Sequence, residues 1–183
     1  MRAFPDGLDH RAERILFRLE VHPRSGVPVL LVQSHSEPDW SWLSQPGARG
    51  YLLPVDEPNP AVKAFDLRLA PGQVLAFRLW ANPTVKRRGR RLGLYREEEQ
   101  MAWLQRKSTA AGFRLLEVRI GKRDVVGGRI HRQGTTHSLR LLGVQFEGLL
   151  QVTDPDRLRE GVFHGLGSGK GLGFGLLSLA RPM

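Results

Sequence analysis

The C-terminal stretch Gly165-Leu-Gly-Ser-Gly-Lys170-Gly-Leu-Gly-Phe-Gly175-Leu-Leu-Ser-Leu-Ala180 places glycine at every second position and then runs directly into an apolar segment. The apolar end, Leu176–Ala180, predicts a strand that closes a sheet. Glycine permits positive φ and close approach to backbone N–H groups, and a lysine adds a point charge beside them. The stretch therefore predicts a loop that binds an anion, with a flexible hairpin tip as the alternative. The residues expected to face a phosphate are Gly167, Gly169, Lys170, Gly171 and Gly173.

Two common nucleotide-binding motifs are excluded by the spacing of these glycines. All six glycines from 165 to 175 fall on odd positions, so the dinucleotide pattern G-x-G-x-x-G cannot be met within the run. A P-loop needs Ser or Thr after its Gly-Lys pair, whereas Gly171 follows Lys170. The loop is therefore neither a Rossmann turn nor a Walker motif.

Positive charge is concentrated in the middle of the chain. Residues 84–140 carry fifteen Lys and Arg against five Asp and Glu, whereas residues 1–83 carry nine against nine and residues 141–183 carry four against four. A basic excess confined to one region is typical of a polyanion site, and nucleic acid is the expected partner. A solubility patch or a targeting tag is the alternative for the densest cluster. That cluster is Lys86, Arg87, Arg88, Arg90 and Arg91, and a more dispersed set comprises Lys122, Arg123, Arg129, His131, Arg132 and Arg140.

Composition limits the remaining classes of protein. The chain has 183 residues, 40% of them hydrophobic, which allows one substantial core or two small ones. There is no cysteine, which removes disulfides and thiolate metal sites. No apolar run approaches membrane-spanning length, and a secretory leader is lacking. We therefore expect a cytoplasmic protein with no metal, no cofactor and no membrane partner.

The second half of the chain, residues 71–183, predicts one complete α+β unit. The order of expected elements is β-α-β-β-α-β, which is the ferredoxin-like unit. The first helix should bury Met101, Trp103 and Leu104, and Asp154 should cap the second helix with Pro155 in its first turn. The elements are strand 73–80, a basic linker, helix 95–107 ended by Gly112, strand 113–120, an irregular basic hairpin tip, strand 139–152, helix 154–162 and strand 176–180.

The first half, residues 1–70, predicts a similar unit whose first strand is missing. A hairpin over 15–21 and 29–34, a short helical segment at Trp40 and Trp42, and a closing strand over 65–69 are expected. Residues 1–13 have room only for the tail of a first helix, with Met1 and Phe4 as its apolar positions. The prediction is thus two tandem ferredoxin-like (RRM-like) domains, the first incomplete at its N-terminus.

Four segments in order resemble the CasE family, the CRISPR RNA-processing endoribonucleases of type I-E systems. They are Phe77-Arg-Leu-Trp-Ala-Asn-Pro83, Glu99-Gln-Met-Ala-Trp-Leu-Gln-Arg-Lys107, Val144-Gln-Phe-Glu-Gly148 and the glycine loop. The early segments Phe4-Pro5 and Ile15-Leu-Phe-Arg-Leu-Glu20 also fit the family.

The resemblance implies two tandem ferredoxin-like domains and a specific activity. Members bind the stem-loop of the CRISPR repeat transcript, cut at its 3′ base without metal to leave a 2′,3′-cyclic phosphate, and remain bound as a subunit of the Cascade complex. A basic hairpin of the second domain enters the groove of the stem, which here would carry Lys122, Arg123, Arg129 and Arg132. The glycine loop would lie on phosphate near the stem.

The catalytic residues are the point at which this sequence departs from the family pattern. In CasE relatives a Tyr and a His near the start of the first helix supply acid–base chemistry, and both positions fall upstream of Met1. His131 and His164 are the remaining catalytic candidates near the expected RNA, with base stacking or a hydrogen bond to phosphate as the alternative role. Two functions therefore stand: an endoribonuclease, or a non-catalytic subunit that binds RNA. A general RNA-binding protein outside CRISPR systems is a third interpretation.

Overall fold

The computed structural model describes residues 3–5, 7–9, 13–22, 24–54, 58–132 and 135–182, without the side chains of residues 129–132 and 135–137. The chain divides into two compact units, one formed by residues 1–15 and 34–68 and the other by residues 16–33 and 69–183. Antiparallel pairing joins every strand pair that is described, and the fold is a mixed α/β fold. The elements are β1 (Leu16–Val21), β2 (Pro28–Gln33), η1 (Ser41–Ser44), η2 (Pro46–Ala48), β3 (Val74–Ala81), β4 (Thr84–Arg87), β5 (Arg90–Gly93), α2 (Glu97–Ala110), β6 (Phe113–Arg132), β7 (Thr135–Val152), α3 (Pro155–His164), η3 (Lys170–Leu172) and β8 (Leu177–Ala180).

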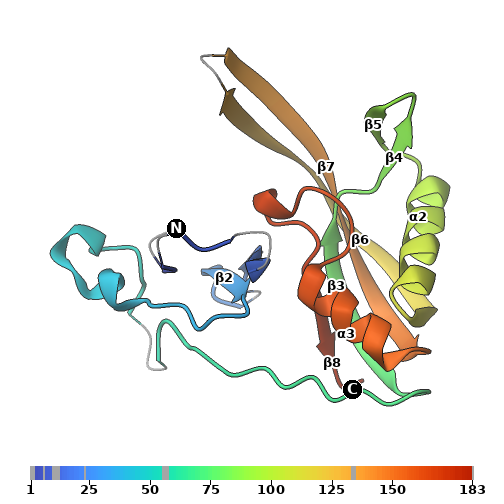
Figure 1. Ribbon diagram of the computed structural model, residues 1–183, viewed down its shortest axis with the longest axis horizontal. Coiled ribbons are helices and arrows are strands. Elements are labelled where there is room, and N and C mark those ends of the chain that lie inside the picture. The colour runs from blue at the N-terminus through green and yellow to red at the C-terminus, as the bar shows by residue number, and fades with distance from the viewer. Residues whose placement is uncertain are drawn as a thin grey trace. The chain divides into compact units, whose positions relative to one another are not determined.

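A four-stranded antiparallel sheet with the order β6-β7-β3-β8 forms the centre of the second unit (Figure 1). In β3, Leu75, Phe77 and Leu79 are buried on one face and Val74, Ala76 and Trp80 are half-buried on the other, as expected for an interior strand that is apolar on both faces. Trp103 of α2 stacks on Phe146 of β7 with ring centroids 6.1 Å apart. The predicted central strand and the helix that covers it are both confirmed.

The helix α2 buries a slightly different face from the predicted one. Trp103 and Leu104 are buried as expected, whereas Met101 is only half-buried and Gln100 is completely buried. The Gln100 side-chain amide donates to the backbone oxygens of Leu94 and Tyr95, at 3.0 and 3.3 Å. The N–H groups of the buried amide satisfy carbonyls of the segment that leads into the helix, while its Oε1 is buried without a hydrogen-bond partner among the described residues.

The expected cap of α3 is confirmed. The Asp154 side chain accepts hydrogen bonds from the backbone N–H groups of Asp156 and Arg157, at 3.2 and 3.1 Å, and Pro155 lies in the first turn. The helix continues to His164, two residues beyond the predicted end. Leu158 and Val162 bury its apolar face.

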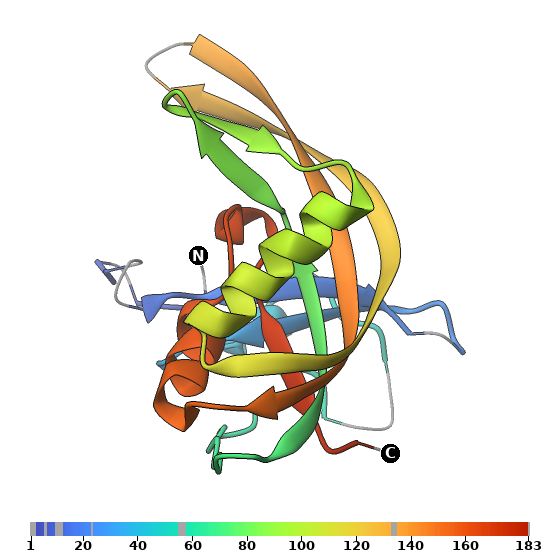
Figure 2. The ribbon, with the colours of Figure 1, turned by 90° about the vertical axis from the view of Figure 1, so that its right-hand side faces the viewer.

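The basic hairpin is longer and more regular than predicted. Residues 121–132, expected to be irregular, continue β6, and their pairing with β7 extends to Arg132↔Thr135; residues 133 and 134 at the predicted tip lie outside the described residues. Because β3 pairs with β7 only over Val144–Gln151, the outer half of β6–β7 is a two-stranded ribbon. The strand β6 is curved, as Figure 2 shows, and its pairing with β7 has register shifts between Leu115 and Glu117 and between Ile120 and Arg123.

The segment predicted as a basic linker forms the hairpin β4–β5 instead. Its two-residue turn uses positive φ at Arg88 (46°) and Gly89 (76°), which matches the twist of the flanking strands. In Figures 1 and 2 this hairpin and the outer half of β6–β7 extend from the same end of the four-stranded sheet.

The hairpin β1–β2 belongs to the second unit and confirms the strands predicted over residues 15–34. Arg18 of β1 is only 5% exposed and donates to the backbone oxygen of Leu176 at 3.1 Å and to the hydroxyl of Ser178 at 2.8 Å. It also pairs with Glu20, at 2.7 Å, and donates to the backbone oxygen of Arg78, at 3.4 Å. The buried guanidinium therefore attaches this hairpin to β8.

The first unit contains only short regular elements among its described residues. The predicted helical segment near Trp42 is the 3-10 helix η1, whereas residues 65–69 form no strand and are mostly exposed, so the closing strand predicted there is wrong. Phe4 is buried in a bend, and Met1 and residues 10–12 of the predicted helix tail lie outside the described residues. Glu13 is helical, and its carboxylate accepts from the backbone N–H and hydroxyl of Ser36, at 2.6 and 2.8 Å.

Candidate nucleic-acid interface

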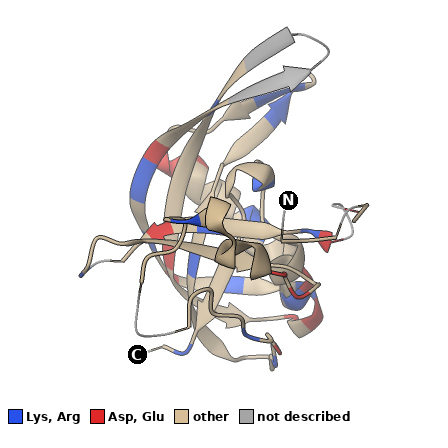
Figure 3. Cartoon of the chain, turned by 90° about the vertical axis from the view of Figure 1, so that its left-hand side faces the viewer, with Lys and Arg blue, Asp and Glu red and all other residues tan. Residues whose placement is uncertain are grey.

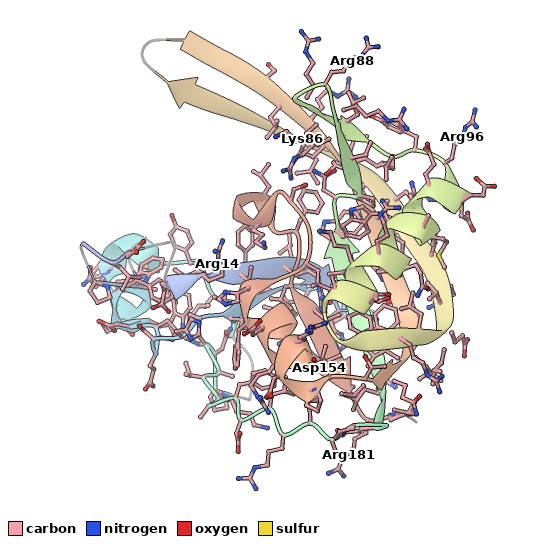
Figure 4. All side chains as sticks on the ribbon, turned by 45° about the vertical axis from the view of Figure 1, so that its right-hand side comes forward. Arg14, Lys86, Arg88, Arg96, Asp154 and Arg181 are labelled. Carbon is pink, nitrogen blue, oxygen red and sulfur yellow. The ribbon has the colours of Figure 1, made fainter. Side chains whose placement is uncertain are left out.

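The hairpin β4–β5 presents the densest positive charge of the chain on an exposed surface. All five basic residues predicted to bind RNA there are exposed: Lys86, Arg87, Arg88, Arg90 and Arg91. Figure 4 shows Lys86 and Arg88 on this hairpin, with the Arg88 side chain directed away from the sheet. The register places Lys86 opposite Arg91 and Arg87 opposite Arg90. Like charges directly across a strand pair are destabilising, so this arrangement favours a bound polyanion.

The ribbon β6–β7 carries positive charge that is partly neutralised by neighbouring carboxylates. Both Lys122 and Arg123 are exposed; the Lys122 Nζ lies 3.2 Å from Oδ2 of Asp124, and the Arg123 Nη2 lies 2.5 Å from Oε2 of Glu97. Ion pairs at the surface contribute at most about 1 kcal/mol, so a phosphate can compete for either cation. Figure 3 marks the basic and acidic positions of this ribbon.

Three predicted site residues near the end of the ribbon can be placed only by their backbone. Arg129 pairs with Ser138, His131 with Thr136 and Arg132 with Thr135 in the β6–β7 register. Their side chains lie outside the described residues, and their roles stay predictions.

The glycine loop has a defined conformation that two of its glycines make possible. Gly169 and Gly173 flank η3, and both adopt the left-handed conformation, with φ of 80° and 83°. A Cβ at Gly169 would lie 2.8 Å from a ring carbon of Phe174, and one at Gly173 would lie 3.0 Å from a ring carbon of Phe17. The loop is therefore a packed structural element rather than the flexible tip that was its alternative.

Part of the backbone that was predicted to face a phosphate is used inside the protein. The Gly173 N–H donates to the oxygen of Lys170 at 3.1 Å, and the Gly175 N–H donates to the oxygen of Trp80 at 2.8 Å. A phosphate contact by the N–H of Gly173 is therefore not available in this conformation. For Gly167, Gly169, Lys170 and Gly171 the phosphate contact stays a prediction.

The structure brings the glycine loop, the ribbon and the start of β4 together. The hydroxyl of Ser168 lies 3.2 Å from that of Thr84 and 3.3 Å from the side-chain nitrogen of Asn82. A Cβ at Gly169 would lie 3.2 Å from Leu141 of β7, and a Cβ at Gly128 of β6 would lie 3.8 Å from Leu172 of η3. The predicted loop therefore lies beside the middle of the predicted basic hairpin, although the two segments are far apart in sequence.

His164 and His131 are not brought together by any described contact. His164 is exposed, is the last residue of α3 and immediately precedes the glycine loop. Within the described part of the chain its imidazole has neither a hydrogen bond nor an ion pair. Its catalytic role stays a prediction, as does that of His131.

Sequence reasoning missed a chain of charged residues across the second unit. Arg78 of β3 bridges Glu20 at 3.3 Å and Glu147 at 2.6 Å, and Arg119 lies 2.6 Å from the other oxygen of Glu147. Burial acts to raise the pKa of Glu147, but hydrogen bonds from Arg119, Gln145 and Arg78 outweigh it, so the pKa lies below its ordinary value of 4.5. No local sequence pattern predicts this network because its members come from four strands.

The described residues contain neither a metal-binding cluster nor a helix that could span a membrane. Among them, no group of three or more His, Asp or Glu side chains is placed to hold a metal ion. No helix built from these residues is long and apolar enough to cross a membrane.

Together these features define a mixed α/β protein, with antiparallel sheets, that carries two basic hairpins beside a packed glycine loop. A family model described as "CRISPR associated protein" matches residues 1–181. The chain therefore belongs to this CRISPR-associated family, which confirms the resemblance stated from the four sequence segments.

Two curated proteins and one solved structure give the extent of the similarity. CRISPR-associated endoribonuclease Cse3 of Thermus thermophilus is 40% identical over 191 residues, covering 98% of this chain and 85% of the relative. The CRISPR system Cascade subunit CasE of Escherichia coli is 36% identical over 132 residues, covering 64% of this chain and 63% of the relative. A structure of CRISPR endoribonuclease Cse3 bound to 19 nt RNA has a TM-score of 0.81 at 38% identity, covering 98% of this chain and 85% of that one.

Proposed function

We propose that this protein binds the stem-loop of a CRISPR repeat transcript, cuts it and stays attached to the product as a subunit of a Cascade complex. The observation that carries the proposal is the similarity along almost the whole chain to an endoribonuclease whose structure contains RNA. The exposed basic hairpins of the second unit support it independently, because phosphate contacts supply most of the affinity of such an interface.

The fold assignment within this proposal is two tandem ferredoxin-like domains, residues 1–70 and 71–183. For the second domain, support comes from the sheet order β6-β7-β3-β8 with α2 between β3 and β6 and α3 between β7 and β8. The hairpin β4–β5 is then an insertion between the first strand and the first helix of that domain. In the first domain, β1 and β2 would be two adjacent strands of the sheet, although this hairpin is grouped with the second compact unit in the structure.

The RNA is held, in this proposal, by shape and charge. An A-form stem offers its phosphates and a deep narrow major groove, so a two-stranded basic ribbon is suited to follow it. Contacts would come from β4–β5, from the ribbon, and from the part of the glycine loop whose N–H groups are not used by the protein. The residues proposed are Lys86, Arg87, Arg88, Arg90, Arg91, Lys122, Arg123, Arg129, Arg132, Gly167, Gly169, Lys170 and Gly171.

Cleavage would proceed by attack of a ribose 2′-hydroxyl on the adjacent phosphorus. The hydroxyl proton passes to a base, the 2′-oxygen bonds to phosphorus, the bond to the 5′-oxygen breaks, and that oxygen takes a proton from an acid. The products are a 2′,3′-cyclic phosphate and a 5′-hydroxyl, so the reaction needs no metal for its atoms to balance. His164 and His131 are the proposed acid–base candidates within this chain.

The test is one experiment on the full chain with its repeat stem-loop RNA in EDTA. Binding should weaken as salt rises, and cleavage should leave a cyclic phosphate. If cleavage occurs, replacing His164 with Ala should slow it without weakening binding, and replacing the exposed His22, which directly follows β1, provides the control. Binding without cleavage would reduce the function to an RNA-binding subunit, and no binding at low salt would refute the proposal.

A further inference from the structure

A pocket lies between β4 and α2, on the side of the β4–β5 hairpin that faces the helix. It has a volume of about 320 Å³ and is lined by Val85, Arg87, Leu94, Glu99, Ala102 and Arg106. Strand alternation explains the lining, because Val85 and Arg87 share one face of β4 while Lys86 lies on the other. Helix periodicity likewise brings Glu99, Ala102 and Arg106 to one face of α2.

The lining combines apolar residues with three charged groups that have no ionic partner among the described residues. Val85, Leu94 and Ala102 supply the apolar part. Among the residues that the structure describes, Arg87, Glu99 and Arg106 form no salt bridge, in contrast to Glu97 one position earlier in the sequence, which pairs with Arg123. These charges are therefore available to a ligand.

The chemistry of this lining suits one unpaired nucleotide. The volume is at the lower end of the roughly 300–1,000 Å³ that is usual for small-molecule sites. Unpaired RNA bases are bound by apolar surfaces and arginine planes that stack on them, together with hydrogen bonds to their Watson–Crick edges. Arg87 and Arg106 can supply stacking or a contact to the nucleotide's phosphate, which leaves Glu99 to contact the base.

A carboxylate selects among the bases because it can only accept hydrogen bonds. Guanine presents two adjacent donors, N1–H and the 2-amino group, with which a carboxylate forms a bidentate pair. Adenine and cytosine each place an acceptor beside their amino group, and uracil places one on each side of its N3–H. Of the four bases, only guanine therefore matches both oxygens of Glu99 without repulsion.

We propose that the pocket between β4 and α2 binds an unpaired guanine of the RNA, with Glu99 as the residue that specifies the base. This inference rests on the proposed function and adds a specificity that phosphate contacts cannot provide. The unpaired nucleotide belongs to the loop or to a flank of the stem-loop. The opposite face of β4–β5, with Lys86 and Arg91, remains available to the phosphates of the stem.

The test uses stem-loop RNAs in which every unpaired position is uridine except for one guanosine, moved through the unpaired positions in turn. At one position, an RNA with guanosine should bind the unsubstituted protein about tenfold more tightly than the RNA with uridine there. This difference lies within the range of a bidentate base contact. Inosine at that position, which lacks the 2-amino group, should retain only part of the gain. Glu99→Gln should abolish the preference.

The matched control is Glu98→Gln, which removes the same charge from the same helical turn without changing the lining of the pocket. This variant should keep the tenfold preference for guanosine. The inference is overturned if guanosine and uridine bind alike at every position, or if Glu99→Gln keeps the preference. If the unsubstituted protein binds none of these RNAs, the proposed function fails as well.

Discussion

Replacing Gly169 with alanine should destabilise the protein, whereas the same change at Gly171 should not. Gly169 has a φ of 80°, and its Cβ would lie 2.8 Å from Cδ2 of Phe174 and 3.2 Å from Cδ1 of Leu141. Gly171 has an ordinary φ, and nothing lies within 4 Å of the position of its Cβ. Both glycines belong to the same loop and are one residue from Lys170, so the pair isolates the effect of conformation and packing.

The expected loss of stability in Gly169→Ala is the sum of two free-energy costs. A side chain in the left-handed region costs about 1–2 kcal/mol, and overpacking a filled site costs about 1–3 kcal/mol. A total of about 3 kcal/mol corresponds to a melting temperature lower by roughly 6–12 °C for a chain of this length. Gly171→Ala should instead change stability by less than about 1 kcal/mol, with a small gain from the lower entropy of the unfolded chain.

Thermal unfolding followed by circular dichroism measures both variants, and a filter-binding assay on the same samples measures RNA affinity. If the loop approaches phosphate at Gly171, Gly171→Ala should bind RNA more weakly. Its melting temperature should still equal that of the unsubstituted protein. Equal melting temperatures for the two variants would refute the packing of the loop described above. An RNA affinity unchanged in Gly171→Ala would remove that residue from the interface.

Three further predictions concern charged groups. Asp154→Ala should lower stability by about 1 kcal/mol, because the cap of α3 is lost; urea unfolding measures this, and Asp154→Asn, which can still cap, should recover most of it. Glu97→Gln should raise RNA affinity by up to about fivefold at low salt, because it releases Arg123 from a surface ion pair; unchanged affinity would place Arg123 outside the interface. The depressed pKa of Glu147 contributes stability that is complete above its ordinary value of 4.5 and is lost as pH falls through the folded-state value. Urea unfolding between about pH 6 and about pH 3 should therefore show a decline that Glu147→Gln makes shallower, and an identical decline in the variant would contradict this role.

The elements that could be predicted were those whose signals are local. In β3 the apolar residues on both faces identified an interior strand, and Asp154 followed by proline identified the start of α3. The glycine loop and the densest basic cluster were also visible, since composition alone marks them. Each of these depends on residues close together in the sequence.

What could not be predicted depends on partners that are distant in the sequence. Residues 121–132 are rich in glycine and charge and look irregular, but pairing with residues 135–144 makes them a strand. Gln100 is buried because carbonyls of the preceding segment need a donor, which no hydrophobic pattern expresses. Leu176 and Ser178, which accept hydrogen bonds from Arg18, lie at the other end of the chain, so no local pattern of apolar residues indicates that Arg18 is buried.

The distribution of carboxylates within the basic region separates two kinds of positive charge. Near the sheet, Arg119 and Arg123 are paired with Glu147 and Glu97, so these cations contribute to the folded structure before any ligand binds. On β4–β5, arginines and a lysine face one another across the strands, and in the described part of the chain no carboxylate pairs with them. Their mutual repulsion lowers the stability of that hairpin, and a polyanion that neutralises them recovers it. Among the described residues Glu99 has no ionic partner beside this hairpin, where a carboxylate weakens non-specific attraction to phosphate, and the proposed contact to a base gives it a role there.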